Sequence, residues 1–594
     1  MARYDLVIRG GTVIDGTGEP RKVADLGIAD GNVARVGAIP QGLAVEEIDA
    51  AGLIVAPGVI DLHTHYDAQL HWDPYCTTSG WHGTTTAVIG NCGFGFAPLQ
   101  PGMQDRYMRM MENTEQIPYD VMHRSMLFDW ESFPDWLAHL HGLPKGINVA
   151  TYLPMNALLS YVLGPDEAKR RPATESERRL MRDILSEAMD AGASGFSFSF
   201  LGSQGNSHVD HDFTAMPSDV MSEEEAYNLA DVLRARGQGV IQILCELPGM
   251  AAPRRHVAAE LARRSGCTVL HNITVPSDVN PESHRSVLRW LDEMNAEGLD
   301  IWTQTFCWRK WLEITPMHFN AWDSVPVLRT LTTAATVEQK LKLVSDPSYR
   351  ARFRAEYDPA YMQEAGGRLE AYTLRDAAGS ARFTAFEGRQ LNEIGGELGI
   401  PVTDLFLDLI FDTGAKVMFS SEEVVTRDPE LITELLRHPR VLAGVSDGGA
   451  HSKHGNGGFW STDMIIWLAR EIKTFSLEEV HNLMSARNAQ AFGLKGRGLI
   501  REGYAADIMV YDFDDLNFER GRYEIVHDLP GGDWRKVTRA QGIRRIVVNG
   551  RVTFADNVCT GATPGRLLRS ERAPDAGLQT THSLRAEVEQ LTTL

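Results

Sequence analysis

The chain has 594 residues, of which 43% are hydrophobic and 23% are charged, and its formal net charge is −21. This composition is typical of a globular protein with at least one large core. The acidic balance argues against nucleic acid as the main partner, because phosphate recognition requires clustered lysine and arginine.

Short alternating segments separated by glycine, Asp-Gly and proline occupy residues 4–55 and predict antiparallel strands joined by tight turns. The same pattern of short alternating segments and turn residues returns after about residue 498. We therefore predict one small β-sandwich domain built from residues 1–57 and 499–594, in which the residues after about 565 form an exposed C-terminal arm.

Between these ends, apolar β-branched runs alternate with helical patterns, as expected for parallel strands joined by crossover helices. Helices are predicted over 176–192 and 222–237, the second with Ser222 as its N-cap. The fold is predicted to be α/β, with a closed (β/α)8 TIM barrel over residues 58–498. Its eight strands are expected at 58–63, 84–90, 147–153, 194–200, 239–244, 268–273, 300–306 and 440–447.

The stretch from about 308 to 439 is too long for an ordinary connection and contains helical patterns of its own. We predict that it forms an inserted subdomain over the mouth of the barrel, before the eighth strand. In such a barrel the loops at the C-terminal strand ends meet on one face, where catalytic residues collect. Residues at the predicted strand ends are therefore the candidates for chemistry.

Two histidines, His63 and His65, end the first predicted strand in the segment PGVIDLHTH. Alternate residues of a strand point to the same side, so both imidazoles can face one metal ion. Imidazole is a common zinc ligand. Two histidines packed inside a core are the alternative, and the pair alone does not decide between these interpretations.

Longer segments carry a resemblance to a known family. The segment PGVIDLHTH, with Asp61 before the histidine pair, resembles the signature of the metal-dependent amidohydrolase superfamily. The segment GNCGFGFAP, after the second strand, narrows the resemblance to the N-acyl-D-amino-acid deacylase (D-aminoacylase) family. The segments RVLAGVSDGGAHSKHGNGG and LMSARNAQAFGLKGRGLIREGYAADIMVYD also look like this superfamily, so the resemblance covers nearly the whole chain.

The resemblance implies a zinc-dependent hydrolase of linear amides. Its centre would hold one or two zinc ions, with His63, His65, Cys92 and His271 as metal ligands. Asp447, at the end of the eighth strand, stands where the superfamily keeps its catalytic aspartate. In the implied reaction zinc polarises the amide carbonyl of an N-acyl-D-amino acid and activates water, while Asp447 acts as general acid and base.

Two departures from the family pattern concern ligands and specificity. The fifth strand lacks the histidine of the family, so Gln242 or Glu246 could replace it, or the centre could use fewer protein ligands. The lysine that usually follows the sixth-strand histidine, and that helps to hold the substrate carboxylate, is also missing. His208, His211 and His454 lie in loops near the predicted mouth and are candidate substrate-binding residues.

Two other functions stay open at this point. One is hydrolysis of a cyclic amide, a carbamate or a xenobiotic amide by the same superfamily, and the other is a catalytically silent interaction protein. Aromatic residues near the mouth favour a bulky substrate: Tyr66, Trp72, Tyr75, Trp81, Trp302, Phe306, Trp308 and Trp311. The expected partners are a small-molecule amide and, as in many relatives, further copies of the chain in a homo-oligomer.

Location is predicted from what the sequence lacks. It contains no run of about 18 apolar residues that could span a membrane, and its start lacks the features of a signal peptide. The six cysteines form neither a disulfide framework nor a paired zinc motif, so most are expected to be reduced thiols. We therefore expect a cytoplasmic protein with no membrane partner.

Overall fold

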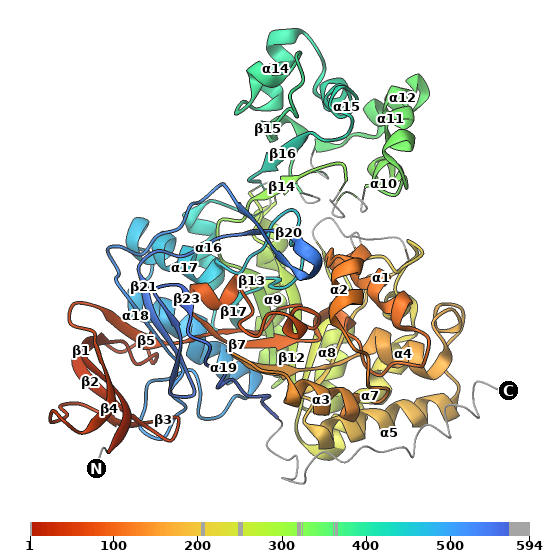
Figure 1. Cartoon of the computed structure of the whole chain (residues 1–594). Coiled ribbons are helices and arrows are strands. Elements are labelled where there is room, and N and C mark those ends of the chain that lie inside the picture. The colour runs from red at the N-terminus through yellow and green to blue at the C-terminus, as the bar shows by residue number, and fades with distance from the viewer. Residues whose placement is uncertain are drawn as a thin grey trace.

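The structure is a computed structural model, and it describes residues 3–569 except 204–207, 248–252, 279, 318–321, 323–324, 360–361, 363–365 and 424. Within this part of the chain, no helix combines the length and the apolar character needed to cross a bilayer. Figure 1 shows a body that contains both sheets and helices, with a smaller lobe standing above it.

Parallel strands form two sheets at the centre of the body, in the orders β17-β13-β12-β11-β10-β9 and β6-β7-β8. The α/β prediction is confirmed, and each predicted strand is present with ends that differ by at most three residues. The strands are β6 (Val59–Asp61), β7 (Thr84–Ile89), β8 (Asn148–Thr151), β9 (Leu153–Pro154), β10 (Gly195–Ser199), β11 (Val240–Leu244), β12 (Thr268–Thr274), β13 (Ile301–Phe306) and β17 (Val441–Gly444).

The two parallel sheets are neighbours in space. Only Tyr152 separates β8 from β9, and an isolated parallel bridge joins Thr64, beyond β6, to Gly448, beyond β17. One core cluster contains side chains from both sheets, among them Val88 and Trp302. The hydrogen-bonded strands nevertheless form two sheets and no single closed ring, so the closed barrel stays a prediction.

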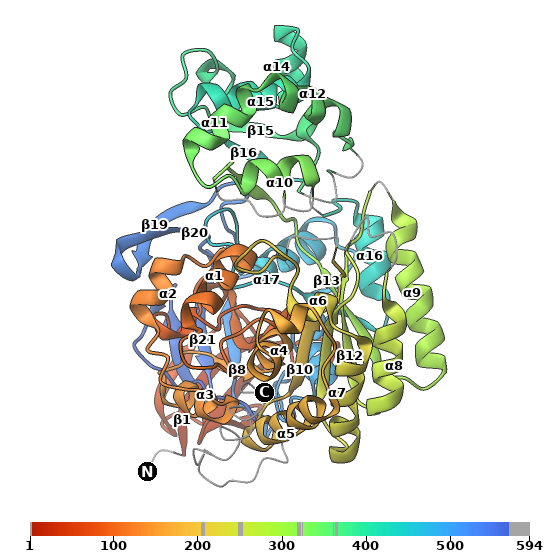
Figure 2. The ribbon, with the colours of Figure 1, turned by 90° about the vertical axis from the view of Figure 1, so that its right-hand side faces the viewer.

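Helices between the strands cover the outside of the sheets (Figure 2). α5 (Glu175–Ala191) begins with a capping box at Thr174 and buries Leu180, Ile184 and Ala188, one helical turn apart, in the main core. α7 (Glu223–Arg236) begins at Ser222, whose hydroxyl accepts the N–H of Glu224, so the predicted N-cap is confirmed. The remaining helices of the body are α1 (Gln104–Glu115), α2 (Tyr119–Ser125), α3 (Phe133–Gly142), α4 (Met155–Leu163), α6 (Pro217–Val220), α8 (Arg255–Ser265), α9 (Pro281–Ala296), α16 (Pro429–Arg437), α17 (Trp460–Met464), α18 (Leu477–His481) and α19 (Arg487–Phe492).

The two ends of the described chain share one sheet, which lies beside the parallel strands (Figure 1). Its N-terminal strands are β1 (Tyr4–Val13), β2 (Lys22–Ala29), β3 (Asn32–Val36), β4 (Ala44–Asp49) and β5 (Ile54–Pro57), and its C-terminal strands are β18 (Ile508–Tyr511), β21 (Ile543–Val548), β22 (Arg551–Ala555) and β23 (Val558–Cys559). β5 joins the two groups, since it pairs with β1 on one side and β18 on the other. Residues 570–594, most of the predicted C-terminal arm, lie outside the described residues.

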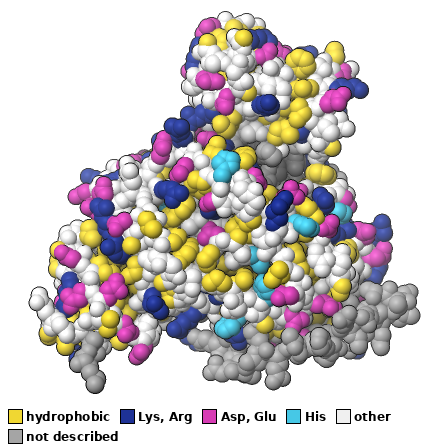
Figure 3. All heavy atoms as spheres, viewed as in Figure 1, with side chains coloured by type: hydrophobic (Ala, Val, Ile, Leu, Met, Phe, Trp, Pro, Cys, Tyr) yellow, Lys and Arg dark blue, Asp and Glu magenta, His cyan; other side chains and the backbone are white. Residues whose placement is uncertain are grey.

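The lobe above the body comes from the stretch predicted to be an insertion, and it has a hydrophobic core of its own. A three-stranded sheet contains β14 (Leu312–Ile314), β15 (Thr373–Asp376) and β16 (Met418–Ser421). The helices of the lobe are α10 (Pro326–Thr332), α11 (Val337–Ser345), α12 (Pro347–Glu356), α14 (Leu391–Leu398) and α15 (Val402–Asp412). Figure 3 shows basic and acidic side chains interspersed over this face of the body and the lobe.

A hairpin from the C-terminal part of the chain lies below the lobe (Figure 2). Its strands are β19 (Glu524–Leu529) and β20 (Asp533–Val537). Lys536 of β20 forms an ion pair of 2.6 Å with Glu313 of β14, and both side chains are buried. The hydroxyl of Tyr523, just before β19, donates to the carbonyl oxygen of Trp311. The hairpin therefore fixes the base of the lobe to the body.

Candidate metal centre

The two histidines that follow β6 lie side by side in the interior. His63 and His65 are 4% and 2% exposed, and their ring centroids are 5.4 Å apart. Thr64, between them, turns the other way, because its hydroxyl donates to the carbonyl oxygen of Val88. The alternation of an extended segment thus brings both imidazoles to one place.

Cys92 brings a thiol to the same place from the turn after β7. Its backbone has φ 56°, and its N–H donates to Oε1 of Gln242 over 2.6 Å. Sγ of Cys92 lies 3.5 Å from Nε2 of His63. His63, His65 and Cys92 each present one ligand atom, and these atoms all lie within 4.8 Å of one another.

This set of donor atoms fits a zinc ion. Zinc bonds of about 2.0–2.3 Å to imidazole nitrogen and thiolate sulfur place neighbouring ligand atoms roughly 3–4 Å apart. Burial raises the pKa of the Cys92 thiol well above its usual value, so an anionic sulfur here requires a nearby cation. Nδ1 of His65 is buried and has no hydrogen-bond partner among the described residues.

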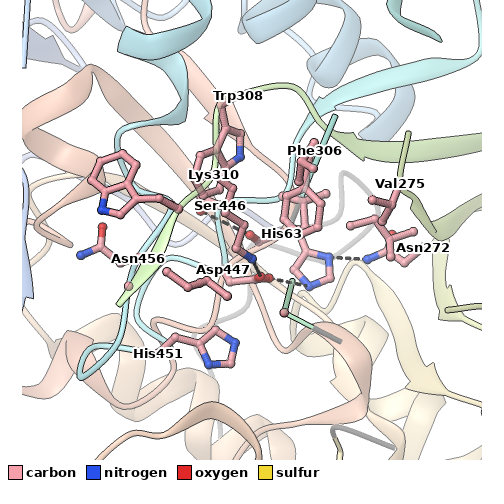
Figure 4. A pocket seen from close by; sticks show the side chains of 18 of the residues that line it. His63, Asn272, Val275, Phe306, Trp308, Lys310, Ser446, Asp447, His451 and Asn456 are labelled. Atoms are coloured by element: carbon pink, nitrogen blue, oxygen red, sulfur yellow. Dashed lines mark hydrogen bonds and ion pairs between the residues drawn. The ribbon is translucent and has the colours of Figure 1, made fainter. Parts of the chain in front are cut away.

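Asp447 reaches this cluster from the loop after β17. Its Oδ1 lies 3.5 Å from Nε2 of His63, and its Oδ2 lies 4.0 Å from Nζ of Lys310. Figure 4 shows the carboxylate between the His63 ring and the Lys310 ammonium group. The Asp447 side chain is 17% exposed, so it can exchange a proton with a molecule in the pocket.

The structure does not bring His271 to this cluster. His271 is fully buried on the other face of β12, where its Nδ1 pairs with the Thr303 hydroxyl and its ring packs on Trp290 of α9. Its Nε2 lies 3.6 Å from the carboxylate of Glu246. The neighbouring residue of β12, Asn272, faces inward instead, and its side-chain amide is hydrogen-bonded to Nδ1 of His63.

The two residues considered as replacements for the missing fifth-strand histidine also face in different directions. Gln242 of β11 lies beside Cys92, with its Nε2 4.0 Å from Sγ. Glu246 instead forms an ion pair with Arg255. Amide side chains of Gln242 and Asn272 therefore occupy the inward positions of β11 and β12.

Lys310 is a residue of the site that the sequence analysis missed. It lines the pocket, and its ammonium group lies 4.3 Å from the centre of the Phe306 ring. Burial lowers the pKa of Lys310, whereas the charge of Asp447 raises it. Its position four residues after β13 could have identified it, because residues beyond strand ends were the candidates.

Glu115 is the second residue that was missed. It is the last residue of α1 and is 2% exposed. One carboxylate oxygen lies 3.7 Å from Nε2 of His65, and the other lies 3.7 Å from Nε2 of His451. Burial raises the pKa of Glu115 well above its usual value. No signal in the sequence separates this glutamate from other acids at helix ends.

The pocket in front of the cluster has mostly apolar walls. Of the aromatic residues predicted there, Phe306, Trp308 and Trp311 line it. The other five are not among the described residues that line it. Trp302 packs in the core between the sheets, and the main core contains or contacts Tyr66, Trp72, Tyr75 and Trp81. Val425, from the segment after β16, contributes to the wall, so residues next to the inserted lobe border the pocket.

The three loop histidines differ in position. His208 and His454 line the pocket. His211 does not, and its Nδ1 lies 3.3 Å from Asp210. Asp210, His211 and Asp212 could in principle hold a cation, but Asp210 already pairs with Arg106 and Lys169.

Comparison with known proteins gives a family match over most of the chain. A family model described as Amidohydrolase family matches residues 46–554. The D-aminoacylase of Alcaligenes xylosoxydans xylosoxydans is 26% identical over 571 residues, which are 95% of this chain and 97% of that protein. The N-acyl-D-aspartate deacylase of the same organism is 27% identical and covers 96% of this chain and 95% of its own length.

A solved structure shares the fold. It is the N-acyl-D-glutamate deacylase from Bordetella bronchiseptica, complexed with zinc and a phosphonate inhibitor that mimics the tetrahedral intermediate of the reaction. The TM-score is 0.62 at 23% identity, over 96% of this chain and 100% of that one.

Proposed function

The chain belongs to the amidohydrolase family, and from this premise we propose that it is a zinc-dependent hydrolase that removes the acyl group from an N-acyl-D-amino acid or a related N-acyl amide. One observation carries the proposal: ligand atoms of His63, His65 and Cys92 cluster within 4.8 Å, and the Asp447 carboxylate lies 3.5 Å from His63. Three metal ligands beside a partly exposed carboxylate are the parts that metal-assisted amide hydrolysis requires. The names of the relatives supply the substrate class.

His63, His65 and Cys92 would hold the zinc ion, with Asp447 beside it. When bound, zinc would polarise the amide carbonyl and make water more acidic. Asp447 would accept a proton from the attacking water and deliver it to the amide nitrogen. A C–O bond forms as the C–N bond breaks, so the products are a carboxylate and a free amine. His271 is left out of this ligand set because it faces Trp290 and Glu246.

Lys310 supports an amino acid as the amine part of the substrate. Among the described residues that line the pocket it is the one lysine, and arginine is absent from them. A partly buried ammonium group in an apolar pocket favours an anionic ligand, such as the carboxylate of an amino acid. Val275, Phe306 and Trp308 would contact the acyl group, and His208 and His454 stay candidates for substrate contacts.

We also propose that the two parallel sheets are the walls of one (β/α)8 barrel over residues 58–498. The Thr64–Gly448 bridge and the core shared by both sheets support it. The β-sandwich of residues 1–57 and 499–594, and the insertion at about 308–439, belong to the same proposal. The homo-oligomer and the cytoplasmic location stay predictions from the sequence.

The test is a substrate screen on the zinc-loaded protein. N-acetyl-D-amino acids, their L forms, hydantoins and dihydrouracil are compared by the release of free amine or by ring opening. The proposal expects turnover of at least one N-acyl-D-amino acid and loss of about 10²–10⁴-fold in kcat for Asp447→Asn. Turnover of cyclic amides alone would favour the other amidohydrolase function. Absence of any turnover would favour a silent interaction protein.

A matched control is Asp212→Asn. Asp212 is also an aspartate, and it belongs to the second candidate cation group, with Asp210 and His211. It is not among the described residues that line the pocket. This variant should keep the kcat of the unmodified chain. An equal loss of kcat in Asp212→Asn and Asp447→Asn would contradict the role of Asp447 as general acid and base.

A further inference from the structure

Lys310 lies in a short segment that has no regular secondary structure. Residues 307–311 stand between β13 and β14 and form neither a helix nor a strand. Trp308 and Lys310 line the pocket, whereas Arg309, between them, is not among the described residues that line it. Because such a segment has no ladder of backbone hydrogen bonds of its own, contacts with other elements must hold Lys310 in place.

Asp463 of α17 binds this segment through Arg309. Its Oδ2 accepts the backbone N–H of Arg309 over 2.7 Å, and its Oδ1 accepts from Nη2 and Nε of the same residue over 2.6 and 3.1 Å. The Asp463 side chain is fully buried, and that of Arg309 is 11% exposed. One carboxylate therefore fixes both the backbone and the planar guanidinium group of the residue next to Lys310.

α17 is itself held inside the body. All five of its residues are buried. The indole N–H of Trp460 donates to Oδ2 of Asp61 over 3.0 Å, and the other oxygen of Asp61 accepts the backbone N–H of His63. The same helix therefore supports a proposed zinc ligand and, through Asp463, the segment of Lys310. It relates the position of the ammonium group to that of the metal centre.

Stability alone does not account for the ion pair of Asp463 and Arg309. Desolvation of two buried charges offsets most of their attraction, and apolar side chains of similar volume are often as stable. A buried pair of arginine and carboxylate provides a fixed geometry instead. The Lys310 ammonium group depends on such a support, because it forms no hydrogen bond to the described residues and lies 4.0 Å from Oδ2 of Asp447 (Figure 4). Its N–H donors are therefore available to a ligand.

We propose that Asp463 is a positioning residue for substrate recognition: through Arg309 it fixes the backbone beside Lys310, so that the ammonium group meets the carboxylate of the amino acid part of the substrate. The inference rests on the proposed function, which assigns this carboxylate to Lys310. Asp463 is not among the described residues that line the pocket, so its effect on the substrate passes through Lys310. Loss of its charge loosens the segment, and a displaced ammonium group forms a weaker charge-assisted hydrogen bond.

Equilibrium binding tests the proposal without turnover. The probe is N-methylsulfonyl-D-leucine, a sulfonamide whose leucine side chain matches the apolar walls of the pocket. The reference is N-isopentylmethanesulfonamide, which has the same shape without the carboxylate. Isothermal titration calorimetry on the zinc-loaded, full-length protein gives the Kd of both. We expect the unmodified chain to prefer the probe. Asp463→Asn should raise the Kd of the probe by about 5–20-fold, as for one weakened charge-assisted hydrogen bond, and leave the Kd of the reference unchanged.

Glu471→Gln is the matched control. Glu471 accepts a hydrogen bond of 2.6 Å from Nη1 of the same Arg309, but its side chain is 47% exposed and the backbone N–H of Arg309 belongs to Asp463. This variant should keep the Kd of the unmodified chain for the probe, and a loss equal to that in Asp463→Asn would contradict the role of the buried carboxylate. Circular dichroism establishes that each variant is folded. If Asp463→Asn does not fold, the double variant Arg309→Met/Asp463→Asn takes its place, because it removes both buried charges together.

A second double variant shows whether the effect passes through Lys310. Lys310→Met should bind the probe and the reference with similar Kd, and adding Asp463→Asn should cause no further loss for the probe. A further loss would show that Asp463 acts by another route. Steady-state kinetics with N-acetyl-D-leucine should give the matching result for Asp463→Asn, a higher KM with a nearly unchanged kcat.

Three binding results would overturn the inference. They are equal affinity of the unmodified chain for probe and reference, an unchanged Kd of the probe in folded Asp463→Asn, and an equal loss for probe and reference in that variant, which would show a purely structural role. The outcome is separable from that of the proposed function. A chain whose binding of the probe depends on Asp463, but which hydrolyses no amide, refutes the function and keeps the inference. A chain that deacylates N-acyl-D-amino acids equally well with Asp463→Asn refutes the inference and keeps the function.

Discussion

Lys310 brings a positive charge into a pocket whose walls are mostly apolar. Its ammonium group lies 4.0 Å from Asp447 and packs on Phe306. If it binds the substrate carboxylate, Lys310→Met should raise KM for an N-acyl-D-amino acid by about 10–100-fold, the equivalent of one charge-assisted hydrogen bond. Steady-state kinetics on the zinc-loaded enzyme measure this change.

The control for Lys310 is a second substrate. An N-acyl amine of the same shape, without the carboxylate, should be hydrolysed by Lys310→Met and by the unmodified enzyme with similar KM. If both substrates lose equally, Lys310 acts through Asp447 and not through the substrate.

The family resemblance identified Cys92 and Asp447 as candidates, and both stand three residues after the end of a parallel strand, at the edge where the loops meet. Glu115 could not be found in this way, since its place depends on how α1 packs against the loop after β17. Lys310 could have been predicted as a site residue from its position after a strand end. In its segment, FCWRKW, only the aromatic residues were considered as parts of the pocket.

The sequence of β12 does not reveal which of its residues face the pocket. Leu270 and Asn272 face the core between the sheets and the pocket, whereas Val269 and His271 face the helices. Both faces are buried, so the run TVLHNI mixes polar and apolar residues without a readable alternation, and the inward face cannot be assigned from the sequence. The strand itself was predicted correctly, but the sequence analysis expected His271, and not Asn272, to face the metal centre.

A pair of variants on β12 tests this alternation. His271→Gln should leave bound zinc unchanged and lower the melting temperature, because it loses the contacts with Thr303 and Trp290. Asn272→Ala should lower zinc affinity, by about 10–100-fold, because it removes the hydrogen bond to His63. Zinc dissociation constants from a chelator competition assay measure both. Zinc loss in His271→Gln would restore this residue as a ligand.

At the scale of the whole molecule, one buried ion pair fixes the lobe to the hairpin. The Glu313 and Lys536 side chains are 7% and 1% exposed and lie 2.6 Å apart. Lys536→Met leaves a buried carboxylate without its partner, so it should destabilise this junction by about 3–5 kcal/mol. Thermal unfolding followed by tryptophan fluorescence measures the loss. The double variant Glu313→Leu/Lys536→Met should recover most of it, and failure to recover would show that packing matters more than charge.

Three histidines away from the site, of which His82 and His481 are buried and His71 is half-buried, make the stability depend on pH. Burial lowers the pKa of His71 to about 4 and the pKa values of His82 and His481 to about 3. Since the ordinary pKa of histidine is 6.5, the unfolded chain binds more protons than the folded chain below about pH 6.5. Stability is therefore complete above about pH 6.5 and is lost as the pH falls toward 4. Each histidine contributes up to about 1.4 kcal/mol per pH unit.

Urea unfolding between pH 4.5 and 7.5 measures this dependence. His82→Gln should be less stable at pH 7, because the contacts with Thr462 and Thr538 change, but its midpoint should fall less steeply with pH. A slope equal to that of the unmodified chain would exclude His82 as one of the groups responsible.

The sheet that joins the two ends of the chain has a consequence for synthesis. β5 is complete after about 57 residues have been made, but its neighbour β18 begins only at Ile508. While the ribosome makes the intervening residues, one edge of β5 has no strand to pair with, and an open edge invites pairing with other chains. We therefore expect nascent chains that stop before β18 to be bound by chaperones or to aggregate, and those that extend past it to be released.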